Sequence, residues 1–215
     1  MFEFRYASFC GLAAALLLAA CTSTYYRALE TVGIEKRDIL ADRVENAREA
    51  QGDAKEQFTS ALEEYRKVVA VDGGDLEEVY DRLNAEYERS VDRAEAVRER
   101  IDSVERVADD LFEEWQEEID AYTDPQLARR SRALLSGTQA DYRDLLAAMH
   151  QAEQKMDPVL ALFNDQVMFL RHNLNARAID ALQDELLVLE EATGTLVRDM
   201  ERAIAEATNF IEKTQ

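Results

Sequence analysis

Apolar residues recur along most of this 215-residue chain at alternating spacings of four and three positions. The longest uninterrupted run extends from Asp75 to Tyr122 and contains neither proline nor glycine. Twelve of its fourteen seam positions are apolar or aromatic, and the fourteen are Leu76, Tyr80, Leu83, Tyr87, Ser90, Ala94, Val97, Ile101, Val104, Ala108, Leu111, Trp115, Glu118 and Tyr122. A 3.5-residue spacing sustained over this length predicts one α-helix of roughly 70 Å whose seam packs against partner helices.

Three further segments repeat this spacing and can supply the partner helices. They run through residues 40–68, 135–170 and 182–210. Apolar residues also flank the seam of the longest run, at Val79, Val91, Val107, Phe112 and Ile119. Because this seam is wider than the stripe of a two-stranded coiled coil, it requires more than one partner. The sequence therefore predicts an all-α fold, an elongated antiparallel bundle of about four long helices with coiled-coil-like seams.

Turn residues separate the first three of these segments. Two glycines follow the first segment, and the next one opens with Asp75 and Glu78, which predict a capping box. The longest run ends before Asp124 and Pro125, a typical helix cap followed by a first helical residue. Both features predict hairpins between antiparallel helices.

Two other positions leave the path of the chain less defined. Residues 173–175 (Asn-Leu-Asn) coincide with a slip in the apolar phase, which predicts either a third turn or a stutter in a continuous helix. Pro158 lies inside an unbroken apolar phase. We therefore expect a kink there rather than the start of a helix.

The second hairpin is strongly polarised in charge. Residues 109–120 contain seven acidic residues and no basic one, whereas Arg129, Arg130 and Arg132 open the next helix. Antiparallel pairing predicts ion pairs between the two groups that fix the register of the hairpin. Three arginines cannot neutralise seven acids, so we expect unpaired acids that bind a basic partner, with a purely solvated face as the alternative. The candidate partner-binding residues are Asp109, Asp110, Glu113, Glu114, Glu117 and Glu118.

Composition supports the helical prediction and narrows the range of functions. Seven glycines and two prolines leave little room for a sheet or long loops. The formal net charge is −20 at pH 7. Nucleic-acid binding and adsorption to anionic lipid headgroups both need basic surfaces, so this charge argues against both.

The N-terminal region predicts export and a lipid anchor. Residues 11–20 are apolar but too few to span a bilayer as a helix. They lead into Leu-Ala-Ala-Cys at residues 18–21, which resembles the lipobox of bacterial lipoprotein signals. The resemblance implies a signal peptide of residues 1–20 and acylation of Cys21 as the lipid-attachment site. The alternative is an ordinary secretory signal with a chance cysteine.

The predicted mature chain has a short tether and one domain. Residues 21–34 form the lipidated tether and residues 35–215 a single helical-bundle domain, which we expect to face the periplasm. By resemblance to sorting in enteric bacteria, where Asp after the cysteine retains a lipoprotein in the inner membrane, Thr22 predicts delivery to the outer membrane. Cys10 would leave with the signal peptide, so no free thiol would remain for a disulfide or for thiol catalysis.

Motifs for covalent chemistry are missing from the sequence. It contains no phosphate-binding loop, no nucleophile elbow and no zinc-protease motif. His150 precedes Glu153 by three positions, but a di-metal bundle site needs two Glu-x-x-His pairs and further inward carboxylates. We therefore expect His150 to face solvent or cap a helix and His172 to fix a turn. No catalytic residue, metal site or cofactor is predicted.

Six short motifs along the chain carry a family resemblance. They are Tyr25-Tyr26, Lys36-Arg37-Asp38-Ile39-Leu40, Asp42-Arg43-Val44-Glu45, Asp72-Gly73-Gly74-Asp75-Leu76-Glu77, Asp157-Pro158-Val159-Leu160 and Arg171-His172-Asn173-Leu174-Asn175-Ala176. They resemble the domain of unknown function 2959 family, which consists of predicted lipoproteins of Gram-negative bacteria. The resemblance extends over essentially the whole mature chain. It implies a lipid anchor, but no activity and no binding residues.

These observations predict an envelope lipoprotein whose rod-like bundle is a structural or adaptor element without catalysis. Its expected partners are a membrane, reached through the lipid anchor, and an unknown basic protein; no nucleic acid is expected. The alternative is a periplasmic carrier or chaperone that holds an apolar ligand or an unfolded client in the bundle. Loosely packed methionine-rich walls between Met149 and Met168 would favour that alternative. An enzyme ranks third because no polar site is indicated.

Overall fold

The computed structural model describes residues 36–70, 75–173 and 176–214, which form four α-helices without any strand. The helices are α2 (Lys36–Ala70), α3 (Leu76–Ala121), α4 (Pro125–His172) and α5 (Ala176–Thr214). The all-α prediction is therefore confirmed. Cys21, the predicted signal peptide and tether, and the turn residues 71–74 lie outside the described residues.

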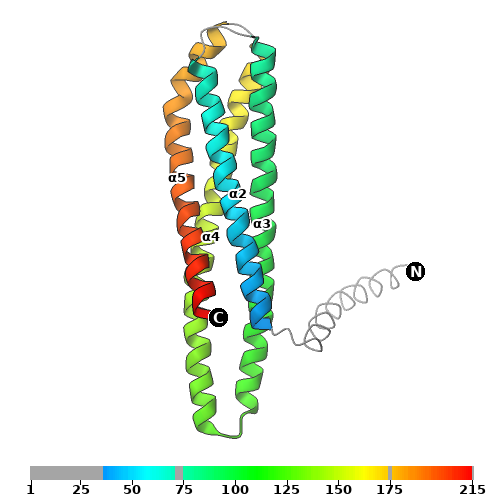
Figure 1. Ribbon diagram of the computed structural model, residues 1–215, viewed down its shortest axis with the longest axis vertical. Coiled ribbons are helices and arrows are strands. Elements are labelled where there is room, and N and C mark those ends of the chain that lie inside the picture. Colours follow the sequence, from blue (N-terminus) through cyan, green and yellow to red (C-terminus); the bar gives the residue numbers. More distant parts are fainter. Residues whose placement is uncertain (1–35, 71–74, 174–175, 215) are drawn as a thin grey trace, which may run out of the picture.

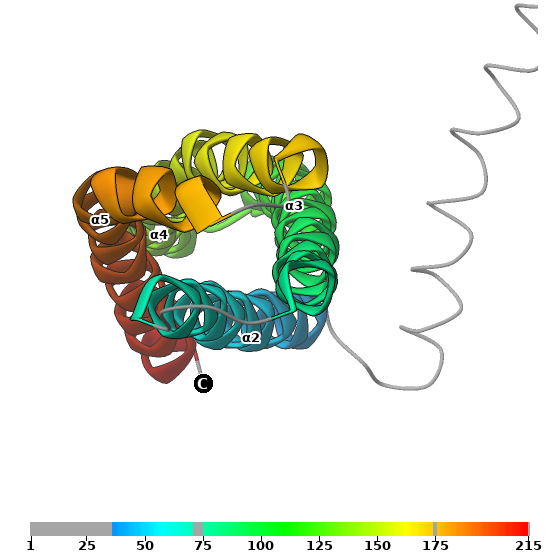
Figure 2. The same cartoon turned by 90° about the horizontal axis from the view of Figure 1, so that it is seen from above.

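The four helices form an elongated up-and-down bundle with a square cross-section (Figure 1 and Figure 2). α2 packs against α3 and α5, and α4 packs against the same two helices. Each helix thus has two neighbours along the sides of the square. This arrangement accounts for the width of the apolar stripes, because residues that flank a seam contact the second neighbour.

The predicted seams form the core of the four-helix part. On α3 the buried residues include Leu83, Ala94, Val97, Ile101, Val104 and Ala108. The largest buried side chains of the other helices include Leu40, Phe58, Tyr65, Leu145, Met149, Met156, Phe163, Leu170, Leu182 and Leu189. Among the seam positions of α3, only those at its end are exposed, namely Glu118 and Tyr122, and Trp115 just before them is half-buried.

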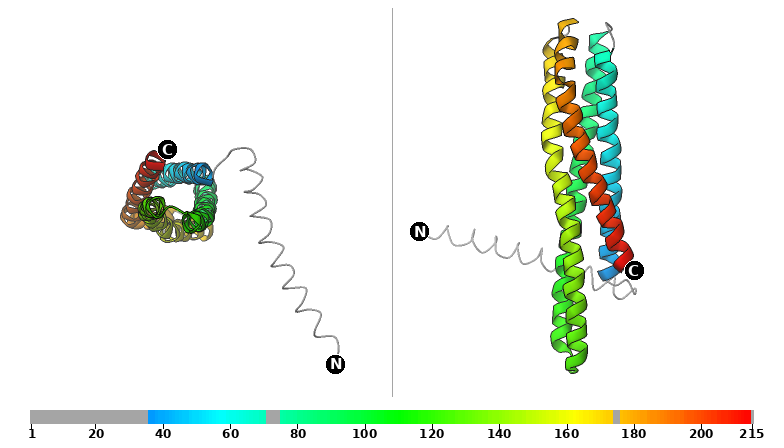
Figure 3. Two further views of the ribbon diagram at one scale, coloured as in Figure 1. Left: turned by 90° about the horizontal axis from the view of Figure 1, so that it is seen from below. Right: turned by 90° about the vertical axis from the view of Figure 1, so that its left-hand side faces the viewer.

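Unequal helix lengths explain this loss of cover. α3 has 46 residues, 11 more than the 35 of α2, and α4 has 48, 9 more than the 39 of α5. At about 1.5 Å per residue these excesses are roughly 16 and 14 Å long. We call residues 113–134 the projecting hairpin. Figure 1 and Figure 3 show it extending past the beginning of α2 and the end of α5.

Side-chain caps begin the helices at the predicted positions. An Asp75 carboxylate oxygen accepts hydrogen bonds from the backbone N–H groups two and three residues on, at 3.0 and 3.4 Å. The Glu78 carboxylate pairs with Arg82 at 3.0 Å and does not complete the predicted capping box. Asp124 accepts a 2.7 Å hydrogen bond from the N–H two residues on, and Pro125 is the first residue of α4. The caps of α3 and α4 were thus predicted correctly.

The third connection is a turn and not a stutter. α4 ends at His172, and α5 begins at Ala176 as a separate antiparallel helix, with residues 174–175 outside the described part. Asn173 closes α4, because its backbone N–H donates to the carbonyl three residues back at 3.1 Å. Pro158 lies inside the continuous α4 with its side chain exposed, so it starts no helix. Proline has no backbone N–H, so one backbone hydrogen bond of α4 is missing there, on the side of the helix that faces solvent.

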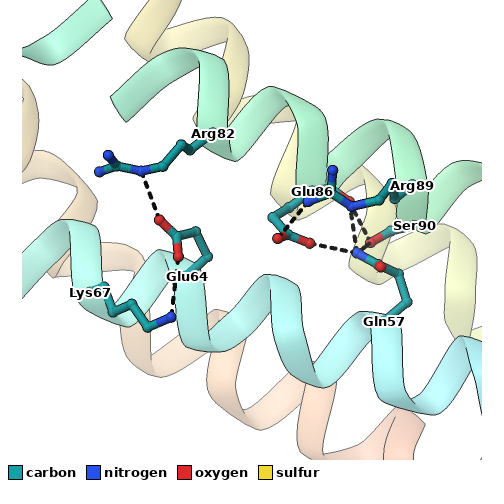
Figure 4. Close-up of polar contacts among 7 residues, drawn as sticks. All are labelled: Gln57, Glu64, Lys67, Arg82, Glu86, Arg89 and Ser90. Atoms are coloured by element: carbon teal, nitrogen blue, oxygen red, sulfur yellow. Dashed lines mark hydrogen bonds and ion pairs between the residues drawn. The ribbon is translucent and has the colours of Figure 1, made fainter. Parts of the chain in front are cut away.

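Polar contacts line the edge of the α2–α3 interface (Figure 4). The Arg82 guanidinium donates to Glu64 at 2.9 Å. One helical turn further along, Glu86 accepts a hydrogen bond from the Gln57 amide at 2.7 Å and pairs with Arg89 at 2.6 Å. Partly exposed pairs of this kind contribute about 1 kcal/mol or less each, so they fix the register more than they add stability.

Two buried polar side chains interrupt the apolar core without compensation. The Gln51 amide is fully buried, and neither its nitrogen nor its oxygen has a hydrogen-bond partner within the described part of the chain. The Thr193 hydroxyl is buried and unpaired as well. Ser90 is also buried, but it donates to the Glu86 carbonyl at 2.8 Å. Gln51, with two unpaired polar atoms, is therefore costlier to bury than Thr193, which has one.

Replacing Gln51 with methionine should stabilise the protein. Methionine fills a similar volume without polar atoms, so we expect the free energy of unfolding to rise by about 1–3 kcal/mol. Denaturant titration followed by circular dichroism measures this change. The control is Gln57→Met, which removes the bond to Glu86 and should not stabilise. A less stable Gln51→Met variant would show that the amide is hydrogen-bonded in solution, contrary to this prediction.

Candidate functional site

The six candidate acids follow α3 from the four-helix part into the projecting hairpin. Asp109 lies beside the four-helix core, close enough to Tyr142 to affect its pKa. Burial is the main cause that raises the pKa of Tyr142, and the negative charges of Glu105 and Asp109 raise it further. Glu114 forms an ion pair with Lys36, the first residue of α2, at 2.6 Å. The remaining four, like Asp109, have no ion-pair or hydrogen-bond partner among the described residues; they are Asp110, Glu113, Glu117 and Glu118.

Only one of the three arginines pairs with this acidic row as predicted. Arg132 contacts Asp120 at 3.2 Å, whereas Arg129 and Arg130 form no ion pair with any described residue. The expectation that all three arginines fix the register is therefore wrong for two of them. Because α3 ends at Ala121 and α4 begins at Pro125, Arg129 and Arg130 lie at about the level of Glu117 and Glu118, but they face solvent and do not contact these acids.

Trp115 marks the base of the projecting hairpin. Its indole N–H donates to the Ser131 hydroxyl at 2.8 Å and so joins α3 to α4. The Arg37 guanidinium lies 5.2 Å from the centre of the indole ring, in a cation–π contact that adds α2. The sequence placed Trp115 on the seam, and the structure places it, half-buried, where the four-helix core ends.

A pocket of about 170 Å³ opens beside Trp115 at this end of the bundle. All four helices contribute to its lining, which consists of Arg37, Leu40, Leu111, Trp115, Leu134, Thr138, Phe210, Lys213 and Thr214. Lys213 closes the end of α5 onto α4 by pairing with Asp141 at 2.6 Å. The volume is close to that of engineered apolar cavities that hold one benzene molecule. The pocket therefore accommodates one large side chain or a small ring, and not an acyl chain or a polypeptide segment.

His150 links α3 and α4 through two carboxylates. Its Nδ1 lies 2.8 Å from Glu153 and its Nε2 lies 2.9 Å from Glu105. Burial lowers the pKa of His150, but the hydrogen bonds and charges of Glu153 and Glu105 raise it more, so the pKa lies above the ordinary 6.5. Both ring nitrogens donate at once only in the protonated form. The sequence pointed to Glu153 but missed Glu105, which is 45 positions away.

The residues that the structure describes include no cluster suited to bind a metal ion and no helix suited to cross a membrane. No group of three or more His, Cys, Asp or Glu side chains in the described ranges is placed to hold a metal ion. Nor does any of the four helices contain an apolar stretch of the length and hydropathy that crossing a bilayer requires. His172 lies exposed in the last turn of α4 without a polar contact to any described residue, so no contact supports the expectation that it fixes the turn.

Comparison with known proteins gives one family. The family model described as 'protein of unknown function (DUF2959)' matches residues 25–214 of this chain. The chain belongs to the DUF2959 family. This confirms the resemblance carried by the six short motifs. The comparison with curated proteins gave no match.

The His150 contacts should make stability depend on pH in a defined direction. Because the folded-state pKa lies above 6.5, the contribution is fully present below pH 6.5 and is lost as the pH rises through the folded-state pKa. Replacing His150 with glutamine should therefore destabilise the protein more at pH 5.5 than at pH 9. Urea titrations at both pH values measure the difference.

His172→Gln is the matched control, since His172 is exposed at the end of α4. It should change stability by a similar small amount at both pH values. A loss for His150→Gln that is equal at both pH values would contradict the ionic account of the His150 contacts.

Proposed function

We propose that this DUF2959 chain is a lipid-anchored protein of the bacterial envelope that faces the periplasm and is held at the outer rather than the inner membrane. Its bundle serves as a stiff structural or adaptor element, and the projecting hairpin binds a basic protein partner. No step of covalent chemistry is assigned to it. The observation that carries the proposal is a two-helix projection with uncompensated charge on an otherwise closed bundle.

The position of the projecting hairpin supports the adaptor role. Lys36 begins α2 beside Glu114, so the proposed tether joins the bundle at the base of the hairpin. The proposed attachment site, Cys21, lies 15 residues before Lys36. Fully extended, that length of chain reaches about 50 Å. The tether and the hairpin therefore share one end of the bundle, and a partner on the hairpin is held close to the anchoring membrane.

The charges of the hairpin support a basic partner. Glu113, Glu117 and Glu118 are solvent-exposed and have no partner among the described residues. A row of unpaired carboxylates attracts a cationic surface during encounter and fixes its orientation. The alternative explanation is that these acidic side chains are simply solvated and bind no partner.

The carrier or chaperone alternative has less support. Met149 and Met156 are fully buried in the core, and Met168 lies exposed on the surface, so these residues do not form the walls of a loose cavity. The pocket beside Trp115 holds about 170 Å³, which is too little for an unfolded client. A rigid adaptor remains the better account of the structure.

Replacing Cys21 with serine tests the anchor. Without the thiol no acyl chain can be attached, so we expect the variant to leave the membrane fraction and to lose metabolic labelling with palmitate. Cys10→Ser is the matched control and should keep both properties, because Cys10 lies in the predicted signal peptide. Equal labelling of Cys21→Ser and the parent chain would refute the anchor.

Charge reversal on the hairpin tests the docking surface. A photo-crosslinking amino acid at Ala121 reports contacts of the hairpin in living cells. Changing Glu113, Glu117 and Glu118 together to lysine should reduce the crosslinked adduct at least tenfold, because the variant repels a basic partner. Glu114 is left unchanged so that its ion pair with Lys36 is preserved.

The control reverses the same number of charges elsewhere on α3. Asp92, Glu95 and Glu99 are exposed acids of the four-helix part without a described partner. Changing these three to lysine should leave the adduct intact. Equal capture by both triple variants, with helicity preserved, would leave a solvated acidic face as the only account of the row.

A further inference from the structure

The projecting hairpin carries an uncovered apolar face. Its large exposed residues are Tyr122 at 46 %, Leu127 at 48 % and Leu134 at 65 % of the fully exposed area. Between the two helices, Ile119 and Leu135 are buried, so the hairpin has closed its own inner contact. The three exposed residues are therefore available for another contact.

Helical register and the pocket show which face this is. Leu127 and Leu134 are seven residues apart on α4, and Leu134 lines the pocket together with Trp115 of α3. Tyr122 follows Trp115 by seven residues on α3, and the Trp115 ring contacts Arg37 of α2. The uncovered face thus continues the surfaces that α2 and α5 cover along the rest of the bundle (Figure 1).

The chain just before α2 has a pattern that suits this face. Tyr25, Ala28, Leu29 and Val32 follow the spacing i, i+3, i+4 and i+7, which predicts a short amphipathic helix. Gly33 comes directly after this pattern, as glycine commonly does at the end of a helix. A helix of only eight residues is not stable alone in water, so its apolar side needs a surface to pack against.

We propose that residues 25–32 form a helix that docks on the uncovered face of the projecting hairpin in the same molecule. Its four apolar side chains cover the exposed apolar residues of α3 and α4. Residues 33–35 connect the docked helix to the beginning of α2. The hairpin and the docked helix together make a three-helix section where the four-helix part ends.

The length and the attachment point of the segment fit this face. α2 begins at the base of the hairpin, because Lys36 pairs with Glu114 at 2.6 Å. Residues 25–35 number eleven, the same as the excess of α3 over α2. A helix of eight residues is about 12 Å long. Together with its three-residue connection it extends along the roughly 16 Å by which α3 exceeds α2.

The family match includes the same segment. It runs from residue 25 to residue 214, so it begins at the first apolar position of the pattern and eleven residues before α2. Residues 25–35 therefore belong to the region that the family shares together with the four helices. This is the extent expected if the segment packs as a part of the bundle.

Charge and covalent linkage favour this segment over a separate molecule. Residues 25–32 contain one base and one acid, Arg27 and Glu30, so the acidic hairpin does not repel the segment as a whole. Both charged residues fall on the side of the helix opposite its four apolar residues. A segment joined to the bundle by three residues is also present at a roughly millimolar effective concentration, which any competing molecule has to exceed.

The pocket beside Trp115 receives the end of the docked helix that lies nearest to α2. Val32 is the apolar residue of the pattern closest to Lys36, and Arg37 of α2 lines the pocket. The pocket volume of about 170 Å³ accommodates one such side chain. Leu29 then lies about one helical turn nearer to the tip of the hairpin.

The docked helix leaves the acidic row open to a partner. Glu113 and Glu117 lie two positions before and after Trp115, which places both on the opposite side of α3. The inference therefore goes beyond the proposed function and depends neither on the basic partner nor on the anchor. If Cys21 is acylated as proposed, only four residues separate it from Tyr25, about 13 Å when fully extended, and the hairpin tip lies close to the membrane surface.

Crosslinking within one molecule tests the docking. The photo-crosslinking amino acid replaces Leu29 in the full chain in living cells. We expect an adduct that migrates as a single copy and in which mass spectrometry joins the Leu29 peptide to residues 115–134. An adduct that instead contains lipid, another protein or a second copy, or the absence of any adduct, would overturn the proposal.

The matched control places the same amino acid at Glu30, on the opposite side of the predicted helix. It should give at least tenfold less of the adduct with residues 115–134. Equal yields from Leu29 and Glu30 would mean that the two segments meet only because they are close along the chain. That result would overturn the proposed helix.

The fluorescence of Trp115 gives a second test, because it is the only tryptophan of the chain. In the purified full chain, changing Leu29 and Val32 together to aspartate should release the docked helix and at least double the rate constant of quenching by acrylamide. Changing Thr24 and Thr31 to aspartate adds the same charges away from the apolar side and should leave quenching unchanged.

Equal quenching of the parent chain and the Leu29 and Val32 variant, with the helicity of the bundle preserved, would overturn the docking. Neither test reads the palmitate label or the adduct at Ala121. Failure of the docked helix therefore leaves the proposed function standing, and failure of the proposed function leaves the docked helix standing.

Discussion

Packing of apolar seams spaced 3.5 residues apart is the constraint on which this structure depends. Each fully buried large apolar side chain of a seam contributes about 1.5–3 kcal/mol, whereas each exposed ion pair contributes about 1 kcal/mol or less. Packing of the seams therefore accounts for the square arrangement of the four helices. The polar contacts along the edges, such as Arg82 with Glu64, adjust the register of the helices. Buried exceptions such as Gln51 show how few polar groups the core contains.

The features with functional interest arise where that constraint ends. α2 and α5 are shorter than the helices they cover, so the seams of α3 and α4 continue without partners. Trp115, the pocket beside it and the unpaired charges of the projecting hairpin all lie at this boundary. The same residues would be ordinary core and edge residues if all four helices had equal length.

The sequence predicted what depends on local pattern. The four segments, the caps Asp75 and Asp124, and the buried seam of α3 follow from spacing and side-chain type, and the structure confirms them. What depends on the offset between helices was missed. Arg129 was assigned to the acidic row although it faces solvent and pairs with none of those acids, and the contact of His150 with Glu105 crosses between helices. The unequal lengths of the predicted segments were the available signal for the uncovered end.

The position of Lys36 has a mechanical consequence. α2 begins beside Glu114 and runs away from the projecting hairpin between α3 and α5. A pull on the chain before Lys36, directed past the hairpin, therefore loads α2 along its own axis. The contacts along all 35 residues of α2 then resist sliding together, rather than parting one turn at a time as they would under a sideways pull. Such a pull therefore loads the bundle in shear, the direction in which a packed helix yields last.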